Sequence, residues 1–309
     1  LKQVGPYRIL KQLGSDFSGT LFQAVHTESD AQVVVRLFSA RVMSGNEERD
    51  RWRMAGKAAT ELDHPNLQRI IAMDSDEDRP YLVMEYIDGY SLRAQLEERG
   101  HLPQLEVVDI MLQAGEALAY GHARDLIHGN LRPSHMIMDS QKRVRLVGLG
   151  TPKQIHKDLR LMANQIGTTS IPLYAPPEIL IDERDADERT DVYNLAAVGY
   201  HLLTGRAPHS GSDLMQAGFR SALQDILPPE AIDPTISKYM NRLLLRALQP
   251  DPHDRYETMD SFLVDLRKCR AGLLAHVMDI PEIASDLPAG RRVARDRRKK
   301  YAPRRQFLT

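Results

Sequence analysis

The pattern of apolar and polar residues divides the chain into an N-terminal part with strands and a longer part with helices. Apolar and polar residues alternate over residues 7–14 and 19–25, which predicts two strands joined by a tight turn that contains glycine. Residues 33–38 are apolar except for Arg36, as in a buried strand. Apolar residues at helical spacing predict a long amphipathic helix over residues 103–124. The positions that set this spacing are Val107, Met111, Ala114 and Leu118.

The C-terminal half continues with helical periodicity and ends on a basic stretch. Three further helices are predicted around residues 214–223, 236–248 and 259–273. Proline and glycine residues then interrupt the pattern before residues 291–309, which contain nine Lys or Arg and one Asp. Two interpretations of this basic tail remain open: a solvated or disordered tail, or a contact with an anionic membrane surface, worth about 1 kcal/mol per basic residue.

Length and composition bound the domain organisation but do not identify a function. The chain has 309 residues, 42% of them hydrophobic, which suits one bilobal domain or two small ones. The net charge of −1 hides an uneven distribution, since the tail carries about +8 and the preceding residues about −9. We expect no nucleic-acid partner.

The single cysteine and the lack of a long apolar run indicate a compartment. Cys269 cannot form an internal disulfide, which fits a reducing environment, and its expected role is packing. No apolar run reaches the roughly eighteen residues that cross a bilayer, and no signal peptide precedes the first predicted strand. We therefore expect a cytoplasmic location, with tethering at the membrane if the chain is part of a longer protein.

One stretch carries the chemistry on which the interpretation depends. Residues 126–138 read L-I-H-G-N-L-R-P-S-H-M-I-M, and residues 144–150 read V-R-L-V-G-L-G. This stretch resembles the catalytic loop H-R-D-L-K-P-x-N-I-L and the D-F-G motif of protein kinases. The resemblance implies an α+β, bilobal protein-kinase-like fold. It would have a small β-rich N-lobe at residues 7–87, a larger helical C-lobe at 88–273 and a C-terminal extension with the basic tail at 274–309.

The resemblance also shows which family residues are replaced. They are Arg36 for the nucleotide-binding Lys, Ala55 for its ion-paired Glu, Asn130 for the catalytic base Asp, Arg132 for the loop Lys, His135 for the metal-binding Asn and Gly148 for the metal-binding Asp. An amide such as Asn130 does not accept a proton at neutral pH. Gly148 has no oxygen ligand, and His135 is a poor ligand for magnesium. A metal site on His128 and His135 is not expected, because no third ligand is spaced to join them.

Residues that resemble the family's structural positions are retained. Residues 167–178 resemble the end of the activation segment, and Glu178 is expected to pair with Arg255 of the matching D-P-x-x-R element. Asp191 is expected to form hydrogen bonds with the backbone of the 126–138 loop. His128 in that loop matches the family's His and is expected to have a structural role. Gly129 stands where the family has an Arg that grips a phosphate on the activation segment, so phosphorylation would lose its usual receiver.

The resemblance also implies a vestigial nucleotide pocket between the two lobes, formed mainly by residues of the N-lobe. Gly14 and Gly19 resemble the first and third glycines of the glycine-rich loop, but Asp16 replaces the middle one. Residues 81–89 resemble the hinge of bacterial eukaryotic-like Ser/Thr kinases, with a gatekeeper, two residues whose backbone faces the adenine, and apolar walls. These are Met84, then Glu85 and Ile87, then Leu21, Val34 and Ile137. The alternatives are a hairpin with Gly14 and Gly19 as turn residues, and ordinary core between the lobes.

These replacements predict a catalytically inactive domain, a pseudokinase that acts as a binding, scaffolding or allosteric module in signalling. Its partner would be a protein, either an active kinase or another signalling protein. No cofactor is expected, with metal-independent binding of ATP or ADP as a second possibility. The alternative is a divergent Ser/Thr protein kinase that retains ATP binding and weak phosphoryl transfer, using Asp16, Asp125 or Asp139 as unusual ligands.

Overall fold

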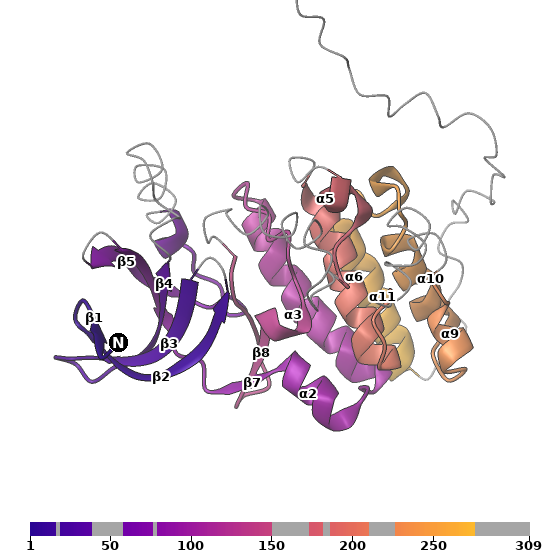
Figure 1. Ribbon diagram of the computed structural model, residues 1–309. Coiled ribbons are helices and arrows are strands. Elements are labelled where there is room, and N and C mark those ends of the chain that lie inside the picture. Colours follow the sequence, from indigo (N-terminus) through magenta and orange to yellow (C-terminus); the bar gives the residue numbers. More distant parts are fainter. Residues whose placement is uncertain are drawn as a thin grey trace, which may run out of the picture.

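The chain folds into a β-sheet and a larger group of helices that lie side by side (Figure 1). The computed structural model describes residues 1–16, 19–38, 58–76, 79–149, 173–181, 186–209 and 226–275. The predicted α+β, bilobal fold is confirmed. Ala55, the predicted helix at 214–223 and the basic tail at 291–309 lie outside the described residues.

The N-lobe is built on one six-stranded antiparallel sheet with the order β1-β2-β3-β4-β6-β5. Its strands are β1 (Gln3–Val4), β2 (Tyr7–Asp16), β3 (Gly19–His26), β4 (Gln32–Phe38), β5 (Ile70–Asp76) and β6 (Arg79–Glu85). The predicted strands at residues 7–14, 19–25 and 33–38 are thus confirmed. Figure 1 shows that the sheet is strongly curled.

Strand β4 is buried on both faces, which explains its nearly continuous apolar sequence. Val33, Val35 and Leu37 pack in one hydrophobic cluster, whereas Val34 packs with Met84 in a second cluster. Side chains alternate between the two faces of a strand. Arg36 therefore lies on the same face as Val34.

A three-stranded sheet with the order β7-β8-β9 begins the second part of the molecule. Its strands are β7 (Gly89–Ser91), β8 (Met136–Asp139) and β9 (Val144–Leu146). A parallel bridge between Leu67 and Leu146 connects β9 to the segment that enters β5. Besides the continuous chain at residues 86–88, this bridge therefore links the two lobes.

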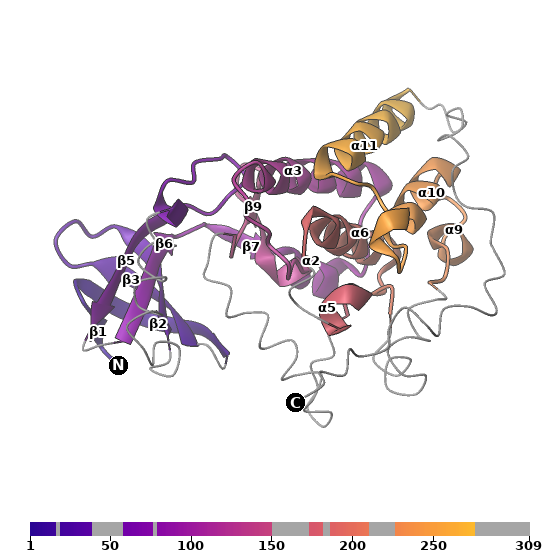
Figure 2. The same cartoon turned by 90° about the horizontal axis from the view of Figure 1, so that it is seen from above.

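The C-lobe helices are grouped around α6 (Figure 2), and buried residues of α6 and α3 belong to one hydrophobic core. The helices are α2 (Leu92–Arg99), α3 (Gln104–His122), α5 (Pro177–Ile181), α6 (Glu188–Thr204), α9 (Pro229–Ile232), α10 (Lys238–Ala247) and α11 (Met259–Leu274), with 3-10 turns η2 (Pro133–His135) and η4 (Pro252–Asp254). The predicted helices at residues 103–124, 236–248 and 259–273 correspond to α3, α10 and α11. Cys269 is buried on α11, as its predicted packing role requires.

Two glycines allow the helices of the C-lobe to pack closely. A Cβ atom at Gly115 of α3 would lie 2.7 Å from Leu263 Cδ2 of α11, and one at Gly199 of α6 would lie 2.3 Å from Met111 Sδ of α3. Real Cβ atoms do not come this close to a neighbour. Helices α6 and α11 can therefore approach α3 more closely than larger residues at these positions would allow.

Helix α6 has strong signals at both ends. Asp187 and Thr190 form a capping box at its start, and Gly205 adopts φ 71° at its end. Within the described ranges, the helices fall short of the length and apolarity that crossing a bilayer demands.

The packing of α3 generates a stability prediction. Val107 on α3 is fully buried, whereas Val264 on α11 is 48% exposed. We expect Val107→Ala to lower the free energy of unfolding by about 2 kcal/mol, through lost burial and a residual cavity. The matched control, Val264→Ala, should change it by less than about 0.5 kcal/mol. Urea unfolding followed by circular dichroism measures both, and equal effects would contradict this description of the core.

Candidate functional site

One buried carboxylate organises the loop that contains the candidate catalytic positions. Asp191 on α6 is fully buried, and its oxygens accept hydrogen bonds from the backbone N–H groups of His128 (2.8 Å) and Gly129 (2.7 Å). Gly129 adopts φ 67°, a conformation that favours glycine. The predicted contact of Asp191 with the loop backbone is therefore confirmed.

The same carboxylate is contacted by His122, which sequence reasoning missed. His122 Nε2 lies 2.8 Å from Asp191 Oδ2, and His122 Nδ1 lies 3.3 Å from Glu188 Oε2. Burial opposes protonation of this imidazole, but its hydrogen bond to Asp191 and the negative charges of Asp191 and Glu188 outweigh burial, so the pKa of His122 is raised above 6.5. The protonated form of His122 therefore stabilises the carboxylate that holds the loop.

His135, at the position of the family's metal-binding Asn, has both ring nitrogens engaged. Arg132 Nε donates to His135 Nε2 at 3.0 Å, so this nitrogen is an acceptor. The hydrogen is then on Nδ1, which donates to the Asn130 carbonyl at 2.8 Å. Burial and the charges of Arg132 and His128 hold the pKa of His135 well below 6.5. The ring is therefore neutral, and its single lone pair is already used by Arg132.

His128 is engaged in the same way. Its Nε2 lies 3.1 Å from the Val147 carbonyl, and its Nδ1 accepts from the Asn130 backbone N–H at 3.3 Å. Burial lowers the pKa of His128, although Asp191 acts in the opposite direction. The rings of His128 and His135 are 5.6 Å apart. Among the residues that the structure describes, no three His, Cys, Asp or Glu side chains gather in a way that could hold a metal ion.

Gly148, at the position of the metal-binding Asp, adopts a conformation that suits glycine. Its φ is 101°, and a Cβ atom there would lie 3.6 Å from His128 Nε2. The space thus accommodates a side chain at ordinary contact distance, whereas the backbone does so only with strain. The loss of a carboxylate at this position is not imposed by crowding.

Arg36 lies on the same face of β4 as Val34, and its charge influences His135 in the 126–138 loop. Its guanidinium lies 5.4 Å from the centre of the Phe38 ring, and its charge contributes to lowering the pKa of His135. The structure therefore brings Arg36, Arg132 and His135 into one electrostatic environment. Ala55, the sixth replaced position, lies outside the described residues.

The glycines of the presumed phosphate loop lie in strands. Gly14 pairs with Leu21, and Asp16 pairs with Gly19, in the ladder between β2 and β3. The interpretation of Gly14 as a turn residue is wrong, because the ladder continues past it to the pair of Asp16 and Gly19. Gly19 is the first residue of β3 and lies next to residues 17 and 18, which are outside the described ranges. A Cβ atom at Gly19 would lie 2.2 Å from the Leu37 carbonyl, whereas one at Gly14 would meet nothing within 4 Å. Close packing against β4 explains why position 19 requires a glycine, but it does not explain the glycine at position 14.

The predicted adenine pocket is only partly assembled. Val34 and Met84 are in one hydrophobic cluster, with Leu21 packed against it. Ile137 lies on β8, opposite Ser91 and Arg145, and is half-buried.

Two residues that sequence reasoning missed contact the hinge. The Gln68 amide donates to the backbone carbonyl of Glu85 at 3.0 Å, and the Arg145 guanidinium forms an ion pair with the Glu85 carboxylate. No motif marks either residue, since these contacts join positions 17 and 60 residues apart.

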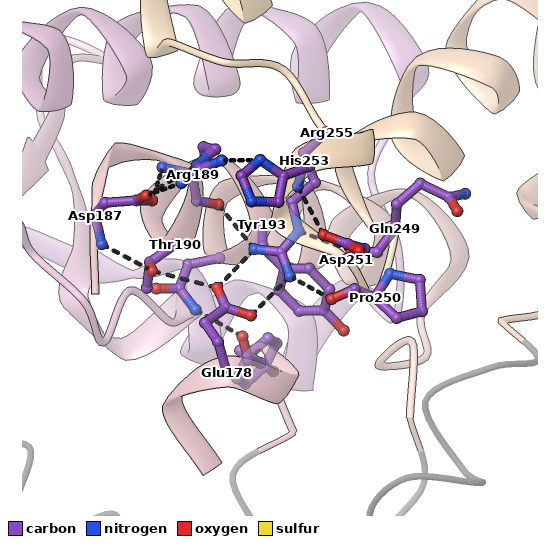
Figure 3. Close-up of polar contacts among 12 residues, drawn as sticks. Glu178, Asp187, Arg189, Thr190, Tyr193, Gln249, Pro250, Asp251, His253 and Arg255 are labelled. Atoms are coloured by element: carbon purple, nitrogen blue, oxygen red, sulfur yellow. Dashed lines mark hydrogen bonds and ion pairs between the residues drawn. The ribbon is translucent and has the colours of Figure 1, made fainter. Parts of the chain in front are cut away.

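The second structural anchor is the ion pair between Glu178 and Arg255 (Figure 3). Arg255 NH1 and NH2 donate to the two oxygens of Glu178 at 2.7 and 2.8 Å, which confirms the predicted pairing. The remaining N–H groups donate to three backbone carbonyls, and the guanidinium lies 4.8 Å from the centre of the Tyr193 ring. These carbonyls belong to Arg189, Gln249 and Pro250. Arg255 thus ties α5, α6 and the segment before α11 together.

Comparison with known proteins finds one family. The model of the protein kinase domain family matches residues 7–264. The chain is 29% identical over 302 residues to the Ser/Thr-protein kinase Pkn1 of Myxococcus xanthus, covering 92% of this chain and 43% of that protein. It is 25% identical over 264 residues to PrkC of Bacillus subtilis, covering 85% and 40%. The chain therefore spans about two fifths of the length of these curated relatives.

A solved structure agrees at the level of the fold. The PknI kinase domain of Mycobacterium tuberculosis superposes with a TM-score of 0.67 at 24% identity, covering 86% of this chain and 97% of that one. Identity this low supports the shared architecture and not a shared activity.

The ion pair of Glu178 generates a stability prediction. Glu178→Gln keeps the shape of the side chain but leaves the buried Arg255 without a counter-charge, so we expect a loss of about 3–5 kcal/mol in the free energy of unfolding. The matched control is Glu97→Gln, because Glu97 pairs with Arg93 on the surface, where such pairs contribute about 0–1 kcal/mol. Chemical denaturation measures both variants. A loss below about 1 kcal/mol for Glu178→Gln would show that the anchor is not essential.

The environment of His122 generates a pH prediction. Because the pKa of His122 is raised in the folded chain, its protonated form adds stability below pH 6.5, and this contribution is lost as pH rises through the raised pKa. We expect His122→Gln to lower the free energy of unfolding by about 1.5–3 kcal/mol at acidic pH, the value of a hydrogen bond to a charged group, and by less at alkaline pH. The other ionisable groups are the same in both proteins, so the difference between the two proteins reports on His122. A difference that grows with pH would reverse the assignment.

Proposed function

Because the chain belongs to the protein kinase family, we propose that it is a catalytically inactive member, a pseudokinase that serves as a binding, scaffolding or allosteric module. The observation that carries this proposal is the state of the catalytic loop. The side chains at its base and metal positions, Asn130, His135 and Gly148, include no carboxylate, and the lone pair of His135 is used by Arg132.

Phosphoryl transfer by this fold depends on positioning and on neutralising charge. Magnesium held by an Asp and an Asn neutralises the phosphates, and a second Asp accepts the proton of the attacking hydroxyl. Magnesium prefers several oxygen ligands in octahedral geometry. Gly148 supplies none, and His135 could coordinate a metal only by giving up its hydrogen bond with Arg132. The residues at these positions therefore do not fit magnesium, and we propose no metal cofactor.

The relatives favour a competing reading, because their names describe Ser/Thr kinases. A divergent kinase would need another carboxylate in place of the lost ones. Asp139 is committed elsewhere: it accepts three hydrogen bonds of 2.9 Å, from the Gln141 backbone and from the backbone and side chain of Arg143. These bonds hold the pKa of Asp139 below its usual value, although burial opposes this. The Asp139 carboxylate therefore stabilises the turn between β8 and β9. This role weakens the alternative of a divergent kinase that uses Asp139.

The partner follows from what the chain keeps. Buried polar residues such as Asp191 and Arg255 hold the fold together. The folded chain can therefore offer a fixed surface to another protein. We propose an active kinase or another signalling protein as that partner, and a cytoplasmic site of action near the membrane if the basic tail binds anionic lipid.

The proposal predicts no phosphate transfer from radiolabelled ATP to the chain itself or to generic protein substrates, with either magnesium or manganese. Removing a single preorganised electrostatic group commonly costs a factor of about 10²–10³ in rate, and here several are replaced together. Asn130→Asp alone should therefore remain inactive, because both metal positions are still unfilled. An active bacterial Ser/Thr kinase serves as the positive control.

Transfer by the wild-type chain above background would overturn the proposal. If that activity also disappeared in Asp139→Asn, the divergent-kinase alternative would be supported instead. The same activity in Asp139→Asn and in the wild type would exclude Asp139 as the substitute carboxylate.

A further inference from the structure

The hinge carbonyl of Glu85 already has an intramolecular donor. Glu85 is the last residue of β6, where the chain leaves the sheet for the C-lobe. The side-chain amide of Gln68 donates a hydrogen bond of 3.0 Å to this carbonyl. An amide N–H₂ and the amino group of adenine are both N–H donors on a trigonal carbon, so the two groups satisfy a carbonyl in the same way.

The backbone around Gln68 is fixed by the C-lobe sheet. The Gln68 backbone N–H donates to the Leu146 carbonyl at 2.8 Å, and Arg145 NH2 donates to the Leu67 carbonyl at 2.9 Å. These contacts hold the segment against β9. The Gln68 side chain therefore starts from an anchored position rather than from a free loop.

The acceptor is held as firmly as the donor. The Glu85 backbone N–H donates to the Arg69 carbonyl at 3.0 Å, and the Glu85 carboxylate accepts from the Arg69 backbone N–H at 2.8 Å. The Arg145 guanidinium pairs with the same carboxylate. Gln68 and Glu85 are thus fixed relative to each other by contacts on both sides, and the hydrogen bond between them requires little additional ordering.

The contact lies beside the apolar cluster that resembles an adenine pocket. Gln68 is two residues before Ile70, which pairs with Met84 across the sheet. Ile70, Met84 and Val34 are in one cluster. Gln68 is half-buried, and its hydrogen bond with the Glu85 carbonyl is partly buried as well.

We propose that Gln68 closes the adenine site from within, by using the Glu85 carbonyl that an adenine amino group would need. This inference deepens the proposed function, on which it rests, by naming adenine nucleotides as the ligands that the cleft excludes and Gln68 as the residue that excludes them. A carbonyl oxygen has two lone pairs, and Gln68 uses one of them. An adenine amino group that approaches along that lone pair has to displace a donor that is tethered beside the acceptor at high effective concentration. The binding energy of its amino group is largely offset by the loss of the Gln68 hydrogen bond.

The test uses adenosine, because it has the base but no phosphate. Isothermal titration without metal compares the wild type with Gln68→Met and Gln68→Val, which keep an apolar side chain but remove the donor. Gln141→Met is the matched control, since Gln141 is exposed in the turn between β8 and β9. We expect no saturable binding by the wild type or the control at millimolar adenosine. Both Gln68 variants should bind at least about tenfold more tightly, which corresponds to about 1.4 kcal/mol.

Two results would overturn the proposal: adenosine binding by the wild type as tight as by Gln68→Met, or no binding by folded Gln68 variants. If neither variant folds, crystals of the wild type grown with excess adenosine decide the question. A retained Gln68–Glu85 hydrogen bond with no adenine on the hinge supports the proposal. An adenine amino group on the Glu85 carbonyl, with Gln68 displaced, contradicts it.

The outcome is separable from that of the proposed function. Adenosine cannot serve as a phosphoryl donor, so its binding reports only on the hinge. Phosphate transfer would overturn the pseudokinase assignment whatever adenosine does, and adenosine binding by the wild type would remove the role of Gln68 while leaving the catalytic replacements as they are.

Discussion

The buried carboxylate of Asp191 is the interaction on which the candidate site depends. It is a charged group in the core of the C-lobe, and such a group is stable there only when its hydrogen-bonding capacity is satisfied. Two loop N–H groups and His122 provide that satisfaction. In return, the carboxylate fixes the backbone from His128 to Gly129, and therefore the start of the loop that carries Asn130, Arg132 and His135.

Arg255 has a similar role, because its guanidinium donates hydrogen bonds to the Glu178 carboxylate and to three backbone carbonyls. Residues of this kind are retained because removing one partner leaves another buried and unsatisfied. The catalytic positions are under no such constraint. A carboxylate that faces a cleft can be replaced by Gly148, or by an Asn such as Asn130, without leaving a buried charge unpaired. This difference explains how a fold can persist after its catalytic groups have been replaced.

Residues at the candidate catalytic positions contact each other. Arg132, His135 and the Asn130 carbonyl form a chain of hydrogen bonds within the loop. Across the cleft, Gln68 and Arg145 engage the hinge residue Glu85. The Glu85 carbonyl and the His135 Nε2 atom are therefore both engaged by side chains of the protein itself, which supports the proposed module with an unliganded cleft.

The sequence by itself determined the strands at residues 7–14, 19–25 and 33–38 and the helices at 103–124, 236–248 and 259–273, because the periods of two and 3.6 residues report directly which face of each element is buried. It also determined the pairing of Glu178 with Arg255 and the loop contact of Asp191, since each lies in a motif with a defined partner. The alternative that made Gly14 a turn residue is wrong, because the ladder between β2 and β3 extends beyond it to the pair of Asp16 and Gly19. Only the tertiary structure decided that His135 has no lone pair to offer and that Gln68 occupies the Glu85 carbonyl. A hydrogen bond between side chains distant in sequence depends on how elements pack, and a single Gln or Arg in a strand segment has no local pattern that reveals its partner.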